Sequence, residues 1–394
     1  MVEHSSKSGH KLMTRLRGDV YMKRVFEVFG KTVQLEFDEK VFIKVNENLS
    51  MYPASKESPS IAIRIIQECD GEEWPYRSGG FLQNPSNHIT YENGFGMRTG
   101  STDVFFEKTE DQLEVEVRVK RGSYLKRMLR RMISMEFSST EDNISQFLHE
   151  IVFIPFAFFF DSIMPIHASS FRTPSGKVDL IGGTGGVGKT STELALCSKE
   201  GYAFVSDDFC IVDENGNVYP NLAYPKIYAY NTRDNKDLEK QLLRKESVLN
   251  KIHWFLGKKL RGEDKVRRKQ SPSTLYKEYV SNKVKADNYF ILVRTSDSKV
   301  IRAQKTTSKH ANAFTLSILK NEYSAFHKQL IWHQYNSMLA GQQAIVDLDK
   351  VFSGWKRLGS HFFENTNNYI VEIPIRIEHQ QLIEGIESVI EECG

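Results

Sequence analysis

The stretch VDLIGGTGGVGKTSTELAL, residues 178–196, decides how the second half of this 394-residue chain is expected to fold. The apolar run at 178–181 predicts a buried strand, and the pattern from Lys189 to Lys199 predicts a helix. Between them, residues 183–190 fit G-x-x-x-x-G-K-[ST], which marks a phosphate-binding loop when a strand precedes it and a helix follows. Glycines let consecutive backbone N–H groups curl around a polyphosphate, and the helix N-terminus adds a favourable dipole. The sequence therefore predicts a nucleotide site at this loop.

Two side chains of the loop are expected to act directly on a nucleotide. Lys189 can reach the β- and γ-phosphates, and the Thr190 hydroxyl can ligate Mg²⁺. We therefore expect ATP and Mg²⁺ as ligands, although the motif does not distinguish ATP from GTP. The expected nucleotide-binding residues are Gly183, Thr184, Gly185, Gly186, Val187, Gly188, Lys189, Thr190 and Ser191.

The same glycines also fit the dinucleotide fingerprint G-x-G-x-x-G, which is a weaker pattern when it occurs alone. Asp208 follows Gly188 at the distance where an acid that binds a ribose is expected. Lys189 and Thr190, directly after the last glycine, favour the phosphate loop. The acid next to Asp208, Asp207, also favours the phosphate loop, since one carboxylate is enough to bind a ribose.

The pair Asp207–Asp208 follows a predicted strand at 203–206. The carboxyl ends of strands are where open α/β sheets bind their ligands. Adjacent acids there can divide the work of phosphoryl transfer, because one can hold Mg²⁺ while the other accepts the proton of an attacking hydroxyl. The alternative is a turn cap with one plain metal ligand. A nucleotide switch needs only the metal ligand, so the second aspartate favours a kinase.

The run from His167 to Asp208 resembles the HPr kinase/phosphorylase family, which shares a core with PEP carboxykinases. That family has a histidine in the strand before the loop, a loop of the form G-x-S-G-x-G-K-S, a helix, and a strand that ends in two aspartates. The resemblance implies a P-loop α/β domain in which His167 and Lys189 act on the phosphates. It also implies that Asp207 is the catalytic base and that Asp208 and Thr190 ligate Mg²⁺.

The resemblance stops short of naming a substrate. Gly185 stands where the family has a loop serine, and the downstream signature of true HPr kinases does not occur. What carries over is a kinase that phosphorylates a hydroxyl, either of a protein or peptide serine or of a small alcohol. An NTP-binding regulatory or assembly module with slow hydrolysis stays open as the alternative. For His167, the alternative is a buried structural histidine.

Upstream of this region, period-two alternation between about Val25 and Lys120 predicts a β-rich N-terminal domain, at residues 1–125. The P-loop α/β domain is expected at 126–394. At the boundary, a basic helix is expected at 124–135. A long apolar helix should follow, capped by Ser139, kinked by Pro155 and ending near Ile163. Further elements are expected as a strand at 166–171, a hairpin at 209–219, a strand at 289–293, a helix at 311–326, a strand at 369–375 and a helix at 380–392.

The net charge of +3 hides a basic segment, because residues 226–287 hold 17 Lys and Arg against 8 Asp and Glu. Its densest part, KKLRGEDKVRRK at 258–269, has few apolar residues to bury. We expect residues 258–269 to form an exposed, mobile excursion within a basic insertion at about 233–286. It is either a solvated loop or a lip that holds an acidic substrate or a phosphorylated partner. Phosphoryl transfer also needs cations beyond Lys189, and the candidates are Lys226, Arg233 and Arg294.

Composition excludes several classes of protein. Hydrophobic residues make up 40% of the chain, which excludes a wholly disordered chain. The four cysteines are scattered and form no C-x-x-C motif, which excludes a disulfide framework and a zinc ribbon. The start resembles no signal peptide, and no apolar run reaches the roughly 20 residues that a membrane span needs. We expect a cytoplasmic protein without a membrane or nucleic-acid partner, and a homo-oligomer is compatible with the sequence.

Overall fold

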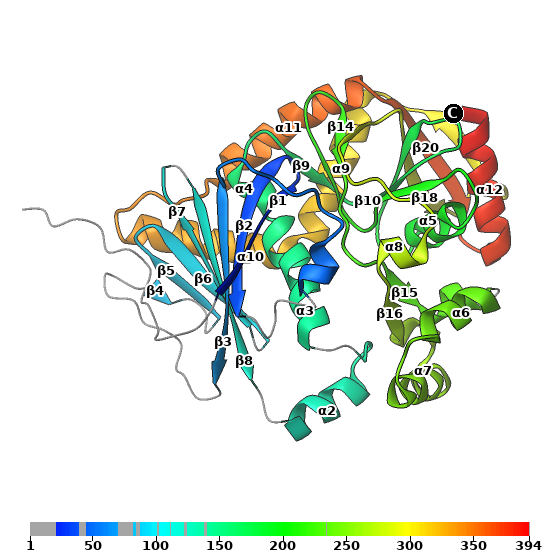
Figure 1. Cartoon of the computed structure of the whole chain (residues 1–394). Helices are drawn as coiled ribbons and strands as arrows, with labels where there is room; N and C mark the ends of the chain where they lie inside the picture. The colour runs from blue at the N-terminus through cyan, green and yellow to red at the C-terminus, as the bar shows by residue number, and fades with distance from the viewer. Residues whose placement is uncertain are drawn as a thin grey trace, which may run out of the picture.

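An eight-stranded sheet forms most of the first part of the chain (Figure 1). The structure, a computed structural model, describes residues 21–38, 45–69, 82–83, 87–100, 102–110, 112–121, 124–137, 140–233 and 235–393. The strands are β1 (Tyr21–Val28), β2 (Lys31–Asp38), β3 (Ile61–Cys69), β4 (Leu82–Gln83), β5 (His88–Tyr91), β6 (Gly94–Thr99), β7 (Thr102–Lys108) and β8 (Leu113–Arg121). Their order is β1-β2-β3-β8-β7-β6-β5-β4, with parallel pairing at β2–β3 and β3–β8. In β3, Ile61, Ile63 and Ile65 are buried and alternate with less buried residues, as the period of two requires.

Helix α2 (Tyr124–Ile133) confirms the predicted basic helix. The long apolar helix that was expected after it is broken into three pieces. The apolar segment then forms α3 (Thr140–Phe147), a π-helix η1 (Leu148–Phe153) and α4 (Phe156–Phe159). Pro155, which has no N–H to donate, lies at the break before α4. The expected cap Ser139 lies outside the described residues.

A six-stranded sheet organises the second part of the chain. Its strands are β10 (Ala168–Arg172), β11 (Val178–Gly182), β12 (Ala203–Ser206), β18 (Asn288–Thr295), β19 (Arg302–Lys305) and β20 (Asn367–Pro374), in the order β12-β10-β11-β18-β20-β19. Four helices flank it: α5 (Lys189–Cys197), α9 (Ser308–Glu322), α11 (Leu348–Glu364) and α12 (His379–Cys393). Tyr289 meets Thr315 of α9, and the next residue, Phe290, stacks on Tyr369 beside α12. Because neighbouring strand residues face opposite sides, helices cover both faces of this sheet (Figure 1).

A four-stranded antiparallel sheet lies beside it, with strands β9 (Met164–Ile166), β13 (Cys210–Val212), β14 (Asn217–Tyr219) and β17 (Val284–Lys285). The pairing of β13 with β14 confirms the predicted hairpin. The strand expected at 166–171 is instead split at His167, because β9 belongs to this sheet and β10 to the six-stranded one.

The basic segment is structured, so the prediction of an exposed excursion at 258–269 is wrong for part of its length. The segment folds into β15 (Lys226–Tyr228), η2 (Ala229–Thr232), α6 (Lys236–Leu243), α7 (Val248–Arg261), η3 (Glu263–Lys265), β16 (Arg267–Lys269) and α8 (Pro272–Leu275). Strand β16 pairs with β15, and both Val266 and Arg268 are buried. Backbone pairing, which hydropathy does not register, orders a stretch that has few apolar side chains.

Helix α10 (Ser324–Leu339) connects the two large sheets. The helix expected at 311–326 is in fact α9 and α10, separated at Tyr323. Helix α10 contacts β5 and β6 of the first sheet (Figure 1). One buried apolar core runs from Phe26 to Ile390, across both parts of the chain. Within the part of the chain that the structure describes, no helix is long and apolar enough to cross a membrane.

Candidate functional site

The order of three strands brings distant parts of the sequence to one edge of the six-stranded sheet. Strand β10 lies between β11 and β12 and is antiparallel to both. The beginning of β10 therefore lies at the edge where β11 and β12 end. His167 precedes β10, Gly183 follows β11 and Asp207 follows β12. The three predicted parts of the site meet there as a consequence of strand order.

The glycine-rich loop, residues 183–188, joins β11 to α5. Gly183 and Gly188 have φ angles of +136° and +115°, in a region that side chains disfavour. A Cβ atom on Gly183 would also lie 2.7 Å from the backbone oxygen of Leu292. The loop therefore needs glycine at both ends. At its exposed tip, the Gly185 N–H donates a hydrogen bond to Glu322 Oε1 at 3.3 Å.

Lys189 is buried beneath the loop and links it to His167. Its Nζ donates to the carbonyl oxygens of Gly183 and Thr184 at 2.9 and 3.0 Å, and lies 3.0 Å from His167 Nε2. Since an ammonium group can only donate, Nε2 is the acceptor and the ring proton is on Nδ1. Burial and the adjacent Lys189 lower the pKa of His167, so the ring is neutral near pH 7. His167 Nδ1 lies 3.5 Å from Asp208 Oδ1.

Asp207 is buried and directed toward the start of α5. Its Oδ1 accepts hydrogen bonds from Ser169 Oγ at 2.8 Å and from Thr190 Oγ1 at 2.9 Å. Burial and the negative charge of Asp208 raise the pKa of Asp207. The Thr190 hydroxyl, expected to share a metal ion with Asp208, is therefore bonded to the other aspartate of the pair.

Asp208 has a strained backbone and a more accessible side chain. Its φ is +68°, a left-handed conformation that is unusual for a residue other than glycine, and 43% of its side chain is exposed. Backbone strain of this kind concentrates at functional sites. Partial burial opposes ionisation, but Lys226, His167 and Lys189 hold the pKa of Asp208 below its usual value.

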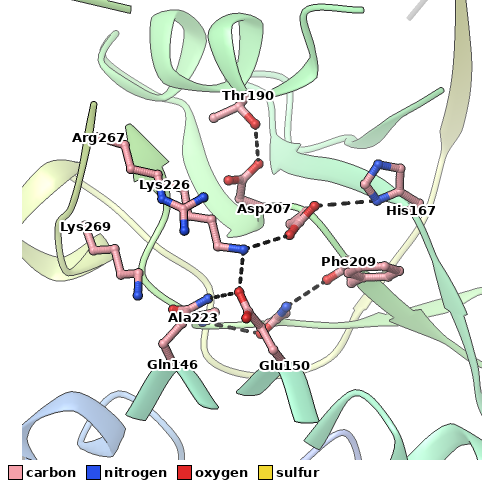
Figure 2. A network of polar contacts seen from close by, with 12 residues as sticks. Gln146, Glu150, His167, Thr190, Asp207, Phe209, Ala223, Lys226, Arg267 and Lys269 are labelled. Atoms are coloured by element: carbon pink, nitrogen blue, oxygen red, sulfur yellow. Dashed lines mark hydrogen bonds and ion pairs between the residues drawn. The ribbon is translucent and has the colours of Figure 1, made fainter. Parts of the chain in front are cut away.

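Lys226 joins Asp208 to a third acid, Glu150. Its Nζ lies 3.5 Å from Asp208 Oδ2 and also pairs with Glu150 Oε1, which in turn accepts a hydrogen bond from Gln146 Nε2 at 2.5 Å (Figure 2). Against the effect of burial, Asp208 and Glu150 raise the pKa of Lys226. Lys226 is thus a permanent cation at the site.

The other two candidate cations have different contacts. Arg233 pairs with Glu263 at 2.7 Å, and Arg294 donates to the backbone oxygen of Ile375 at 3.2 Å. Glu150, by contrast, was not anticipated from the sequence. In the sequence, Glu150 is marked only by its position at the edge of a long apolar run. No local pattern connects it with Lys226, which lies far downstream.

The oxygen atoms at this site suit a magnesium ion that arrives with a nucleotide. Among the described residues, no group of three or more His, Cys, Asp or Glu side chains could hold a metal by itself. The Thr190 hydroxyl and the Asp207 carboxylate, in contact at 2.9 Å, supply two oxygen ligands. Mg²⁺ is usually held by one or two protein groups together with substrate phosphates, and so the donor set fits.

No protein-family model matches the chain, and no curated protein sequence matches it either. The functional argument therefore depends on the residues of the site. They combine a glycine-rich loop backed by a buried lysine, a hydroxyl–carboxylate pair, and a partly exposed carboxylate paired with Lys226.

Proposed function

We propose that the chain is an ATP- and Mg²⁺-dependent phosphotransferase that moves the γ-phosphoryl group to an alcohol hydroxyl. The observation that carries the proposal is the meeting of Lys189, Thr190, Asp207 and Asp208 at one sheet edge, linked through His167. These groups match the parts that phosphoryl transfer requires, namely a phosphate cradle, oxygen ligands for a metal, and a proton acceptor. The resemblance of residues 167–208 to the HPr kinase/phosphorylase family supports the same reaction.

In this proposal, the glycine-rich loop and Lys189 bind the phosphates of the nucleotide. Lys189 exchanges its bonds to loop carbonyls for bonds to phosphate oxygens. A neutral His167 with its proton on Nδ1 accepts from Lys189 and so orients the ammonium group. Thr190 and Asp207 would hold Mg²⁺, which when bound neutralises charge on the phosphate oxygens.

Asp208 is then the proton acceptor, which exchanges the roles that the resemblance implied for the two aspartates. Accessibility supports this assignment, since a general base must reach the hydroxyl that it deprotonates. Asp207 is enclosed by Ser169 and Thr190, whereas the side chain of Asp208 is more exposed and contacts Lys226. The lowered pKa of Asp208 keeps its carboxylate ionised.

The acceptor oxygen forms a bond to the γ-phosphorus while the bond from that phosphorus to the β,γ-bridging oxygen breaks. The acceptor proton moves to Asp208 and later to solvent, and ADP leaves with the bridging oxygen. Lys189 and Lys226 offset negative charge on opposite sides of the transferring group.

The test is a phosphate-transfer assay read by mass spectrometry. The purified chain, ATP and Mg²⁺ are mixed with a cell extract that has been divided into protein and small-metabolite fractions. We expect one fraction to gain the mass of a phosphoryl group with the intact chain and with Arg233→Ala, a surface-cation control. Lys189→Ala should lose both transfer and nucleotide binding. ADP release without a phosphorylated acceptor would instead support a nucleotide-hydrolysing switch.

A further inference from the structure

Helix α7 exposes an apolar stripe to solvent. A surface helix of a globular protein ordinarily turns its apolar stripe toward the core and its polar residues toward solvent. The buried residues of α7 are instead Asn250, His253, Trp254 and Gly257. Six large apolar side chains are between 41% and 75% exposed: Val248, Leu249, Ile252, Phe255, Leu256 and Leu260. Their spacing places them in one stripe along the helix, on the side away from the buried residues.

Specific contacts hold α7 in this orientation. Trp254 Nε1 donates a hydrogen bond to Glu239 Oε1 at 2.7 Å, and His253 Nε2 donates to the Ser134 carbonyl oxygen at 2.9 Å. A Cβ atom on Gly257 would lie 2.5 Å from the side chain of the residue before β16, so the helix packs closely there. Turning the apolar stripe inward would break these contacts. The exposure of the stripe therefore follows from the way α7 is bound to the rest of the chain.

The charged residues of α7 and of its neighbour α2 are all cations. Each helix contains four Lys and Arg residues and no Asp or Glu. The two helices meet where the Arg261 guanidinium group donates to the Ile133 carbonyl oxygen at 2.8 Å, and Figure 1 shows both at the same edge of the molecule. The side chains of Leu129 and Ile133 in α2 are also exposed. We call the exposed apolar residues of these two helices, with their cations, the α7 face.

Charge limits what can cover the α7 face. An apolar surface on helices that carry only cations is complementary to a surface that is both apolar and anionic. A second copy of the same face would bring cations against cations, which disfavours a symmetric dimer through this face.

Shape narrows the choice further. A partner helix is usually bound in an apolar groove, but the cavity beside α7 touches this helix at Asn250, on its buried side. The apolar stripe itself is the outer surface of one helix. A lipid bilayer needs no groove, because an amphipathic helix lies in the plane of the interface with its apolar side chains among the acyl chains. Anionic headgroups add attraction for nearby Lys and Arg residues.

We propose that the α7 face binds the surface of an anionic phospholipid bilayer. In this arrangement Phe255 and Leu256 enter the boundary of the acyl chains, and Lys251 and Lys259 lie at the headgroup phosphates. The inference goes beyond the proposed reaction and does not depend on it. The expectation of no membrane partner came from the lack of an apolar run of roughly 20 residues. A helix that lies on a membrane needs an apolar side and nearby cations, and it needs no such run.

Flotation of the full chain with lipid vesicles tests the inference. The vesicles compared are phosphatidylcholine alone and an equal mixture of phosphatidylcholine and phosphatidylglycerol. We expect binding to the mixed vesicles to be at least about tenfold tighter, because each cation near an anionic surface adds to the attraction. At about 1 M salt, where the Debye length is about 3 Å, this preference should disappear. Equal binding to the two vesicles at low salt, or binding to neither, would overturn the inference.

Paired substitutions locate the apolar part of the contact. Phe255→Ser combined with Leu256→Ser should weaken binding to the mixed vesicles at least about tenfold. Ile331→Ser combined with Met338→Ser, which removes two exposed apolar side chains from α10, is the matched control and should leave binding unchanged. All four side chains are exposed, so both variants should fold, which urea denaturation checks. Unchanged binding in the α7 pair, or equal loss in the two pairs, would contradict the proposal.

Charge reversal separates a contact at the α7 face from general attraction to a basic protein. Lys251→Glu combined with Lys259→Glu should abolish the preference for mixed vesicles. Lys328→Glu combined with Lys356→Glu changes the net charge equally at exposed positions of α10 and α11 and should keep that preference. Equal loss in both pairs would refute the α7 face as the site. A lack of vesicle binding, with a light-scattering mass that halves in the apolar α7 variant, would assign the face to a second copy instead. None of these measurements uses ATP or an acceptor, so their failure would leave the proposed reaction untouched.

Discussion

Asp207 and Asp208 are chemically identical neighbours, and their surroundings make them different. Asp207 accepts hydrogen bonds from two hydroxyl groups in a buried position, and its pKa is raised. Asp208 is held in a left-handed backbone conformation between Lys226 and His167, and its pKa is lowered. Turning the backbone at Asp208 is what directs the two carboxylates to different partners.

Changing each aspartate to asparagine should therefore impair a different property, transfer for Asp208 and Mg²⁺ binding for Asp207. Asp208→Asn removes the proton acceptor and leaves the Thr190–Asp207 pair intact. We expect transfer to fall by about a hundredfold or more while Mg²⁺-dependent nucleotide binding is retained. Asp207→Asn should raise the Mg²⁺ concentration needed for half-maximal binding. The phosphate-transfer assay measures the loss of transfer, and titration with a fluorescent ATP analogue at several Mg²⁺ concentrations measures nucleotide and Mg²⁺ binding in both variants.

The opposite result would return each carboxylate to the role that the resemblance implied. That outcome is loss of transfer in Asp207→Asn with an unchanged Mg²⁺ dependence of nucleotide binding, together with a higher Mg²⁺ concentration for half-maximal binding in Asp208→Asn. Glu364→Gln, an exposed acid at the end of α11, is the matched control and should leave both measurements unchanged.

At the scale of single elements, the sequence predicted what depends on local pattern. Strand β12 ends at Ser206 as expected, and α5 begins at Lys189 as expected, because an apolar run and a glycine-to-helix junction are visible within a few residues. The sequence could not predict that β10 lies between β11 and β12, which is what brings His167 to Lys189. Strand order depends on long-range pairing that no local pattern contains.

The same limit explains the errors in the basic segment and at Glu150. Val266 is buried because β16 pairs with β15, and Glu150 reaches the site because Lys226 extends to it. In both cases, the partner is remote in sequence. Lys226 had been one of three equivalent candidate cations, and only its contacts distinguish it from Arg233 and Arg294.

The junction between the glycine-rich loop and α5 requires glycine at position 188, and substitution by alanine tests this requirement. An alanine there must adopt φ near +115°, and its Cβ would lie 2.8 Å from Leu382 Cδ2 of α12. Gly176→Ala is the matched control, since it also has a positive φ but meets no atom within 4 Å. Both variants should lose roughly 1–2 kcal/mol of unfolding free energy to backbone strain, and Gly188→Ala should lose more.

Urea denaturation of the two variants measures this difference. The nucleotide titration adds a second readout, because Gly188→Ala alters the loop and Gly176→Ala does not. Equal stability of the two variants, with equal nucleotide affinity, would show that the contact between α5 and α12 adjusts without cost and that the loop tolerates a side chain at Gly188.

At the scale of the whole molecule, buried histidines connect the first sheet with the helices that follow it. His88 of β5 bonds to Gln329 of α10 at 2.9 Å, and His333 of α10 packs against Phe95 of β6. His149 of η1 contacts the Tyr52 hydroxyl at 3.1 Å. Each of these histidines therefore joins segments that are remote in the sequence.

Burial lowers the pKa of these three side chains, to about 4 for His88 and His149 and to about 3 for His333. In the unfolded chain, each would titrate near 6.5. The unfolded state therefore binds more protons between about pH 6.5 and 4, and the free energy of unfolding falls as the pH falls through this window. The loss is on the order of 1 kcal/mol per histidine for each pH unit, and stability is fully regained above about pH 6.5.

His149→Gln isolates one of these contributions. A glutamine can still donate to the Ser145 carbonyl, as His149 Nδ1 does at 2.8 Å, and accept from Tyr52, but it takes up no proton. We expect the difference in unfolding free energy between pH 7 and pH 5 to shrink relative to the unaltered chain. The exposed His361, changed to glutamine, should leave that difference unchanged. Urea denaturation at the two pH values measures this difference, and an unchanged difference in His149→Gln would mean that His149 does not contribute to the acid sensitivity of the fold.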